Sequence, residues 1–194
     1  GFYTIIKAMD EYIRFVLLTG VSKFSKTGVF SGLNQLNDIS MNSAYSGMLG
    51  ITEEELKTHF RHDILEFANT ENISDEEAFQ KIQKWYNGYC FSRKCTQVYN
   101  PFSTLMFFAN KEFKNYWFET GTPSFLINLL KEKEYEVSAI PIKVDEMDFS
   151  TYELESLLLP PLLFQTGYLT IKNYEPARML YPLDFPNAEV KNSF

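Results

Sequence analysis

Cysteine, positive charge and long apolar runs are all scarce in this 194-residue sequence. Its two cysteines, Cys90 and Cys95, are too few for the disulfide framework of a small secreted domain, so we expect a reduced pair. No apolar run approaches the roughly 18 residues of a membrane-spanning helix, and the N-terminus lacks the charged and then apolar layout of a signal peptide. These absences predict a soluble, cytoplasmic protein with no membrane partner.

Lysine and arginine number 18 against 25 acidic residues, which gives a net charge of −7. This balance argues against a surface built for phosphate backbones in general, although it leaves room for a local basic patch. Apolar residues make up 45% of the chain and aromatic residues 16%, a composition typical of globular proteins. Because the chain opens on Gly1 without a methionine, we expect a piece of a longer protein.

The most informative stretch is an apolar run at residues 15–18 that ends in a polar, basic loop. The run has no alternation of apolar and polar residues, which predicts a strand buried on both faces of a parallel sheet. Sites in such sheets lie at the carboxyl ends of the strands. Thr19, Ser22, Lys23 and Lys26 are therefore the candidate site residues.

Residues 20–27 also resemble the phosphate-binding loop G-x-x-x-x-G-K-[ST], except that Ser25 replaces the second glycine. That glycine lets the backbone curl so that its N–H groups face the phosphates. The segment after Thr27 also lacks a strong helix to direct its dipole at an anion. A phosphate loop here is the minor alternative, and it predicts nucleotide binding by this chain unaided.

The sequence between residues 52 and 101 contains three signals for the start of a helix. The sequences TEEE (52–55) and SDEE (74–77) are capping boxes, and Asn100 followed by Pro101 predicts another helix start. We expect the helix after Pro101 to bury four apolar residues, which are Phe102, Leu105, Met106 and Ala109.

The second half of the chain predicts short strands beside one helix. Residues 89–91 and 96–99 flank a polar tip and predict a short hairpin. Residues 138–144 predict an edge strand or extended crossing around Pro141. Residues 153–166 predict a helix that Pro160 and Pro161 kink or split, followed by a hairpin of residues 168–171 and 179–181. A helix followed by a hairpin is the tail of a winged-helix unit.

Three further patterns have a functional and a structural interpretation, and the structural one is favoured for each. His59 and His62, with Asp63, have a spacing that can hold a metal on one helix, but no third ligand follows, so we predict no metal site. Glu189 and Lys191 form the E-x-K element of PD-(D/E)XK nucleases without the preceding Pro-Asp pair. Five aromatic residues could offer a platform for a base but fit a core better, namely Trp85, Tyr86, Tyr89, Tyr116 and Trp117.

The chain resembles the AAA-ATPase-like family of bacterial proteins, which are often joined to a C-terminal PD-(D/E)XK nuclease-like domain. The resemblance lies in segments that follow one another in the same order along nearly the whole chain: FVLLTGVSKFSK (15–26), NQLNDI (34–39), GITEEE (50–55), WYNGY (85–89), YNPFS (99–103), YWFETGTP (116–123), FQTGYLTI (164–171) and FPNAEV (185–190).

The resemblance implies a mainly α fold with small β content (α+β) in three parts. Residues 1–44 would be the last strand and sensor-like loop of an α/β P-loop ATPase sheet. Residues 45–137 would be a helical, lid-like domain with a short hairpin, and residues 138–194 a winged-helix-like unit. Thr19 and Ser22 would be sensor-like catalytic residues, and Lys23 and Lys26 would lie near phosphate.

The resemblance further implies that the full-length protein binds and hydrolyses ATP with Mg²⁺. The phosphate loop and the nuclease-like domain would lie before and after this chain, as its partners within the same protein. The chain alone would be inactive and would need no cofactor. The alternative is a non-enzymatic module that binds protein or nucleic acid, with Lys172 and Arg178 on the C-terminal hairpin as the contacts for DNA.

Overall fold

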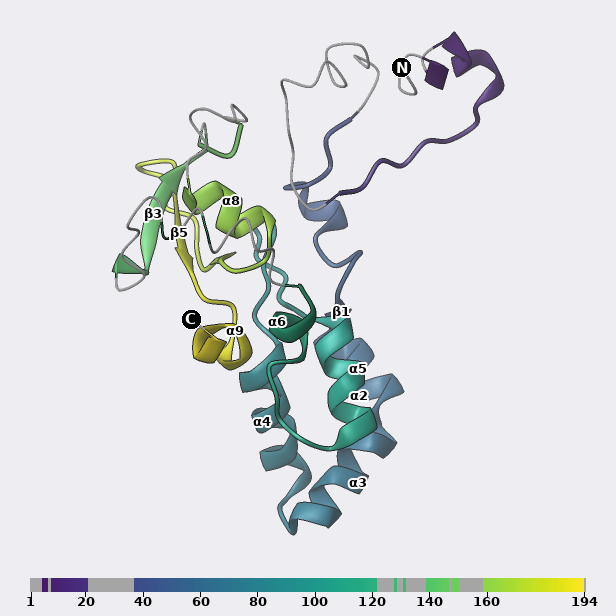
Figure 1. Cartoon of the computed structure of the whole chain (residues 1–194), viewed down its shortest axis with the longest axis vertical. Helices are drawn as coiled ribbons and strands as arrows, with labels where there is room; N and C mark the ends of the chain where they lie inside the picture. Colours follow the sequence, from purple (N-terminus) through teal and green to yellow (C-terminus); the bar gives the residue numbers. More distant parts are fainter. Residues whose placement is uncertain are drawn as a thin grey trace.

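A computed structural model describes residues 5–6, 8–20, 37–121, 128, 131, 139–146, 148–150 and 159–193. Within them, helices dominate the first half and a small antiparallel sheet the second, so the fold is α+β as predicted (Figure 1). A short 3-10 turn, η2 (Ser43–Tyr45), precedes the first strand. None of the helices in these residues is both long and apolar enough to cross a membrane.

The helical part is opened by the predicted capping box. Thr52 Oγ1 accepts a hydrogen bond from the Glu55 backbone N–H at 3.2 Å, and Glu55 Oε2 accepts one from the Thr52 N–H at 2.8 Å, which starts α2 (Glu53–His59). Helix α3 (Arg61–Glu71) follows after a break at Phe60. Ser74 Oγ accepts from the Glu77 N–H at 3.2 Å and caps α4 (Asp75–Tyr86).

A hairpin-like turn follows α4, as predicted. Tyr89 and Val98 exchange backbone hydrogen bonds of 3.2 and 2.9 Å. Strand β2 (Val98–Tyr99) then pairs antiparallel with β1 (Ile51–Thr52), so Gly50 lies against the Val98 side chain. Gly88 has a φ of +102°, and a Cβ there would lie 2.2 Å from the Pro186 carbonyl oxygen, so only glycine fits this close approach.

The turn also joins the two cysteines. Cys90 and Cys95 form a disulfide, with their Cα atoms 5.0 Å apart. The expected reduced pair is therefore wrong for this structure, because the pairing of residue 89 with residue 98 folds the chain back and brings the two sulfurs together.

Helix α5 (Pro101–Asn110) starts where predicted, with Asn100 Oδ1 accepting from the Ser103 N–H at 3.2 Å, but it buries a different face. Phe102 and Leu105 are 43% and 51% exposed. The buried residues are Ser103, Thr104, Phe107 and Phe108. The reason is aromatic packing, because the Phe107 ring lies 4.6 Å from that of Phe113 and 5.0 Å from that of Phe67.

The sheet of the second half has the order β3-β5-β4 and is antiparallel throughout. Strand β3 (Ile142–Asp145) lies at its edge as predicted, β5 (Leu180–Asp184) is central, and β4 (Thr170–Ile171) is the other edge. The described part of α8 is Leu159–Gln165, with Pro160 and Pro161 near its start. Residues 153–158 of the predicted helix lie outside the described residues, so the kink or split at the prolines stays a prediction. Helix α9 (Ala188–Ser193) ends the described chain. The winged-helix assignment and the predicted domain bounds stay predictions.

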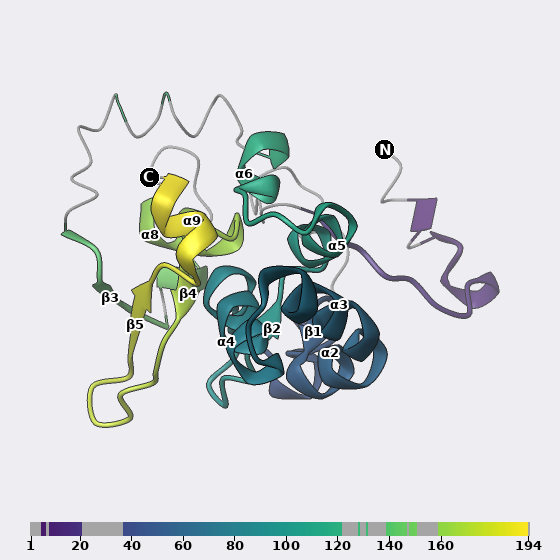
Figure 2. The same cartoon turned by 90° about the horizontal axis from the view of Figure 1, so that it is seen from below.

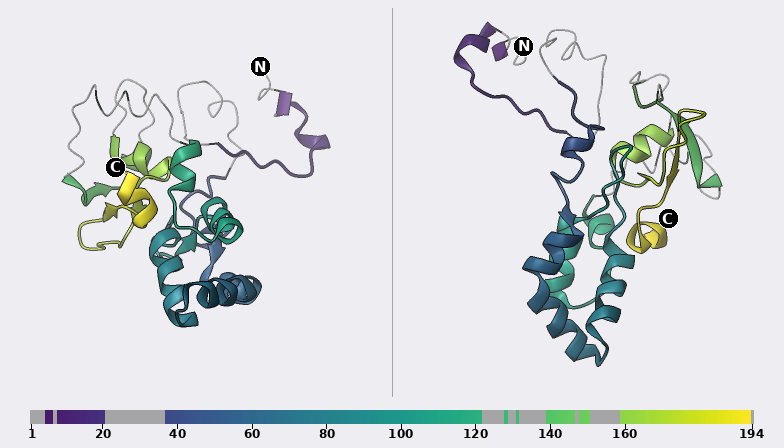
Figure 3. Two further views of the ribbon diagram at one scale, coloured as in Figure 1. Left: turned by 60° about the horizontal axis from the view of Figure 1, so that its bottom comes forward. Right: turned by 180° about the vertical axis from the view of Figure 1, so that it is seen from behind.

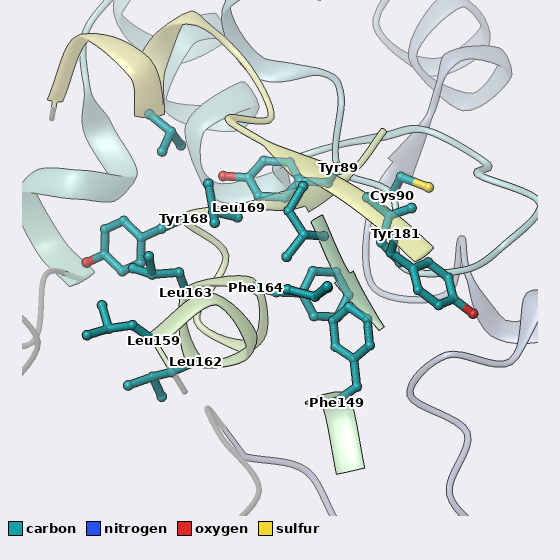
Figure 4. Close-up of a cluster of buried hydrophobic side chains, with 14 of the residues drawn as sticks. Tyr89, Cys90, Phe149, Leu159, Leu162, Leu163, Phe164, Tyr168, Leu169 and Tyr181 are labelled. Atoms are coloured by element: carbon teal, nitrogen blue, oxygen red, sulfur yellow. The ribbon is translucent and has the colours of Figure 1, made fainter. Parts of the chain in front are cut away.

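Two groups of buried side chains make up the core. The helical cluster draws on residues 56–116 and centres on Leu56, Ile82, Tyr86 and Phe107. The sheet cluster joins Tyr89, Cys90 and Val98 to the C-terminal sheet and α8. In Figure 4 the Phe149, Phe164 and Tyr181 rings point toward one another, and the Phe149 ring lies 5.0 and 5.3 Å from the other two. The helices of the first cluster pack side by side (Figure 2).

The strand predicted at residues 15–18 is not formed. Residues 13–20 are irregular apart from a bend, and Phe15 and Leu17 are 78% and 54% exposed. This segment runs well away from the helices and the sheet (Figures 1 and 3). A buried parallel strand needs a neighbouring parallel strand, and both sheets in the described residues are antiparallel and exclude this segment.

Candidate functional site

The predicted nucleotide-site residues are not brought together in the described chain. Thr19 is exposed on the irregular segment that ends at residue 20. Ser22, Lys23 and Lys26 lie outside the described residues, as does most of the alternative phosphate loop. The assignment of these four residues stays a prediction.

The two histidines do not have the one-helix arrangement that the disfavoured metal-site interpretation would need. His59 ends α2, whereas His62 lies in the first turn of α3, so the two are not on one helix, and both are exposed. Among the described residues, no three His, Cys, Asp or Glu side chains gather in a way that could hold a metal.

Most of the aromatic residues considered as a platform belong to the core. Tyr86, Tyr89 and Tyr116 are 0%, 5% and 7% exposed. The partly buried Trp117 packs on Tyr168, with ring centroids 5.0 Å apart. Trp85 differs, because it is partly exposed and lines a groove.

The most unusual polar feature is a junction at Glu189, in the first turn of α9. The Glu189 residue is fully buried. Its Oε1 accepts two hydrogen bonds of 2.8 Å, one from the Ser103 hydroxyl of α5 and one from the Trp117 backbone N–H of α6 (Tyr116–Gly121). That N–H lies in the first turn of a helix, where it has no partner within the helix. One carboxylate oxygen thus ties α9 to two other helices.

The position of Glu189 follows from local structure in α9. Asn187 Oδ1 accepts from the Val190 N–H at 3.1 Å and caps the helix start. Val190 beside it is fully buried in the sheet cluster. Because residues 189 and 190 both lie on the inner side, Lys191 is left exposed. The E-x-K pair is therefore split between interior and surface, which supports its interpretation as a coincidence.

The electrostatics of the junction disfavour the charged form of the Glu189 carboxyl relative to a carboxyl in water. Burial raises the pKa of Glu189, and the hydrogen bonds from Trp117 and Ser103 only partly oppose this rise. The second oxygen of Glu189, Oε2, makes no hydrogen bond in the described part of the chain. The same is true of the hydroxyl of Thr104, the residue after Ser103 on α5. Burial also raises the pKa of Tyr89, and the Glu189 carboxylate adds to that effect when it is ionised. The junction is buried, so we interpret Glu189 as a structural residue that holds α9 to α5 and α6.

Sequence reasoning missed this junction. A signal was present, because Ser103 and Thr104 are two small hydroxyl residues inside an otherwise apolar helix. Such a pair on a buried face requires a polar partner. The sequence alone does not reveal that the partner is 86 residues away at Glu189.

Comparisons with known proteins give one short family match and one long relative. A family model described as "Predicted AAA-ATPase" matches residues 1–30. An uncharacterised protein encoded in the 5′ region of vnfD in Azotobacter chroococcum mcd 1 is 41% identical over 194 residues, which covers 98% of this chain and 35% of that protein. The chain thus spans about a third of the length of this curated relative. No solved structure matches the chain significantly. The similarity to a predicted AAA-ATPase therefore lies in the residues that include Thr19, Ser22, Lys23 and Lys26.

Proposed function

We propose that this chain is a segment of a longer AAA-type protein that binds and hydrolyses ATP with Mg²⁺. In this proposal residues 1–44 complete the ATPase sheet, and residues 45–137 form a lid-like body beside it. One observation carries the proposal, namely that the apolar run at residues 15–18, within the segment similar to a predicted AAA-ATPase, is exposed.

The exposure of this run has an energetic consequence. Burying a Phe or Leu side chain contributes about 1.5–3 kcal/mol, and both Phe15 and Leu17 are more than half exposed. A contiguous exposed apolar segment marks a surface that another part of a protein covers. The relative from Azotobacter chroococcum is about three times as long as the aligned region, so it has the polypeptide that such a cover needs.

The proposed roles in the ATPase follow from the chemistry of the loop. A hydroxyl at a strand end, from Thr19 or Ser22, can position water or a γ-phosphate oxygen, and Lys23 and Lys26 can neutralise phosphate charge. The described residues bring no acidic cluster together for Mg²⁺. As the family resemblance implies, the proposal assigns the phosphate loop, the metal ligands and a nuclease-like domain to the remainder of a longer protein.

The test is binding of a fluorescent ATP analogue with Mg²⁺ to this chain and to the longer polypeptide. We expect the longer form alone to bind. In the longer form, Ser22→Ala or Thr19→Ala should lower ATP turnover at least tenfold while binding is retained. Thr58→Ala, which removes an exposed hydroxyl from α2, is the matched control and should leave turnover unchanged.

Two results would contradict the proposal. If the short chain binds the analogue and Lys26→Ala abolishes binding, the phosphate site is the loop at residues 20–27. If the longer polypeptide neither binds nor hydrolyses ATP, the AAA-type assignment is wrong for the whole protein.

A further inference from the structure

Helix α5 has two apolar faces, and only one of them is covered in the described chain. On its inner face Phe107 is buried in the helical cluster, and the Ser103 hydroxyl bonds Glu189. Its outer face carries four apolar residues at helical spacing, namely Phe102, Leu105, Met106 and Ala109. Met106 is partly buried and the other three are exposed. A helix that is apolar on both faces is typical of a buried position, so the outer face is predicted to have a partner.

The segment before β1 extends this exposed surface. Tyr45 and Met48 are exposed there, and Leu49 is the most exposed of the three, at 73%. Strand β1 pairs with β2 so that Ile51 lies opposite Tyr99, and α5 begins two residues after Tyr99. The chain before β1 therefore comes close to the first turn of α5 (Figure 1). We call the outer face of α5 and these three exposed residues the α5 patch.

The α5 patch belongs to two stretches of the sequence without charge. Residues 39–52 and 95–110 contain no charged residue, although charged residues make up 22% of the chain. Surface helices normally place charged side chains on the face that meets water, as α2 and α4 do. A charged partner such as nucleic acid would meet no counter-charge on these two stretches. The patch therefore fits an apolar, uncharged protein surface.

The position of the α5 patch indicates which partner covers it. The chain reaches the patch from the N-terminal segment that is similar to a predicted AAA-ATPase, and Phe15 and Leu17 of that segment are also exposed. The N-terminal segment and α5 lie on the same side of α6, and α9 lies on the other side (Figures 1 and 2). The two exposed apolar surfaces are thus placed to meet the same body.

We propose that the α5 patch is the surface onto which the ATPase body of the longer protein packs, through an apolar and uncharged surface of its own. The existence of that body rests on the proposed function. The new element is the contact itself, because it specifies which face of the lid-like residues 45–137 turns toward the ATPase. The relative from Azotobacter chroococcum, of which the aligned region covers 35%, has additional polypeptide for such a body.

The test is hydroxyl-radical footprinting of this chain and of the longer polypeptide, read by mass spectrometry in the absence of nucleotide. Leu105, Met48 and Tyr45 report on the patch. Met179, which is 61% exposed just before β5, is the matched control. We expect the three patch residues to be oxidised about threefold more slowly in the longer polypeptide, because the centre of an interface excludes water. The oxidation rate of Met179 should change little.

A charge on the outer face of α5 tests whether the contact depends on it. Leu105→Asp should leave the unfolding midpoint of this chain unchanged, since the side chain is exposed. In the longer polypeptide the same change should return the oxidation rates of Met48 and Tyr45 to those of the short chain. Met179→Asp adds the same charge on the C-terminal hairpin and should leave the patch protected.

Three outcomes would overturn the proposal. Equal oxidation rates of the patch residues in the two forms would show that the longer protein leaves the patch open. Protection that grows with the concentration of the short chain would show that a second copy covers the patch. Protection that survives Leu105→Asp would show that the outer face of α5 does not hold the contact.

The ATP experiment separates this proposal from the proposed function. Protection of the patch without binding of the ATP analogue would overturn the proposed function and leave the docking surface in place. Binding of the analogue by a longer polypeptide whose patch is unprotected would overturn the docking surface alone.

Discussion

At the scale of single residues, the buried carboxyl of Glu189 is the most consequential group in the described chain. Removing a partner from such a group leaves other polar atoms without hydrogen bonds, at a cost of about 1–3 kcal/mol for each. Here the atoms at risk are the Ser103 hydroxyl and the Trp117 N–H. Glu189→Ala should therefore be destabilising, whereas Glu189→Gln keeps an acceptor at the same place.

The raised pKa of Glu189 predicts a pH dependence of stability. In the unfolded chain the carboxyl ionises near its ordinary value of 4.5, whereas in the folded chain it holds its proton to higher pH. Between those two values the unfolded state binds fewer protons, so stability falls as pH rises through this window and then levels off. Each unit of pKa elevation costs about 1.4 kcal/mol.

This prediction is checked by urea unfolding between about pH 4 and pH 8. The wild type should lose stability relative to Glu189→Gln as pH rises, and Glu71→Gln, at an exposed position on α3, should follow the wild type. A difference between the wild type and Glu189→Gln that is constant across this range would show that folding does not raise the pKa of the carboxyl.

At the scale of elements, helix starts are where sequence and structure agree best. The capping boxes depend on hydrogen bonds between residues three apart, so the pattern at Thr52 contains all the information needed. We predict that Thr52→Ala lowers the free energy of unfolding by about 1 kcal/mol. Thr58→Ala, at an exposed position in the last turn of α2, is the control and should be neutral or slightly stabilising. Chemical denaturation measures the free energy of unfolding of both variants. Equal changes in the two would mean that the Thr52 cap does not contribute to stability.

It was harder to predict which face of a helix is buried than where the helix starts. In α5 the sequence favours burial of Phe102 and Leu105, yet the structure buries Ser103 and Thr104. The choice between faces depends on Phe113 and Glu189, which lie outside the helix, and periodicity within α5 carries no information about them. The prediction of a strand at residues 15–18 also depended on long-range partners, since a buried strand needs neighbouring strands and neither sheet of the described residues includes this segment.

At the scale of the whole molecule, changes in the exposed N-terminal segment can test the stability of this chain separately from the ATPase activity that we propose for a longer polypeptide. Phe15→Ser combined with Leu17→Ser should leave the unfolding midpoint of this chain unchanged, since both side chains are exposed. In the longer polypeptide the same double change should abolish ATP turnover, because two buried positions of the proposed sheet become polar. Thermal unfolding and an ATPase assay give the two readouts.

A clear drop in the midpoint of the short chain would contradict this prediction, since it would show that residues 15 and 17 already pack within it. Unchanged turnover in the longer form would show that the ATPase does not use this segment.

The Glu189 junction also sets an order of events during synthesis. The buried members of the helical cluster all lie between residues 56 and 116, so this cluster can close while the ribosome is still translating the second half. The Ser103 hydroxyl and the Trp117 N–H then stay hydrated until residue 189 emerges, because their partner is 86 and 72 residues downstream. A nascent chain stalled before that point would carry a folded helical half whose surface around the Ser103 hydroxyl and the Trp117 N–H is still open to water, and the later synthesis of α9 would close it.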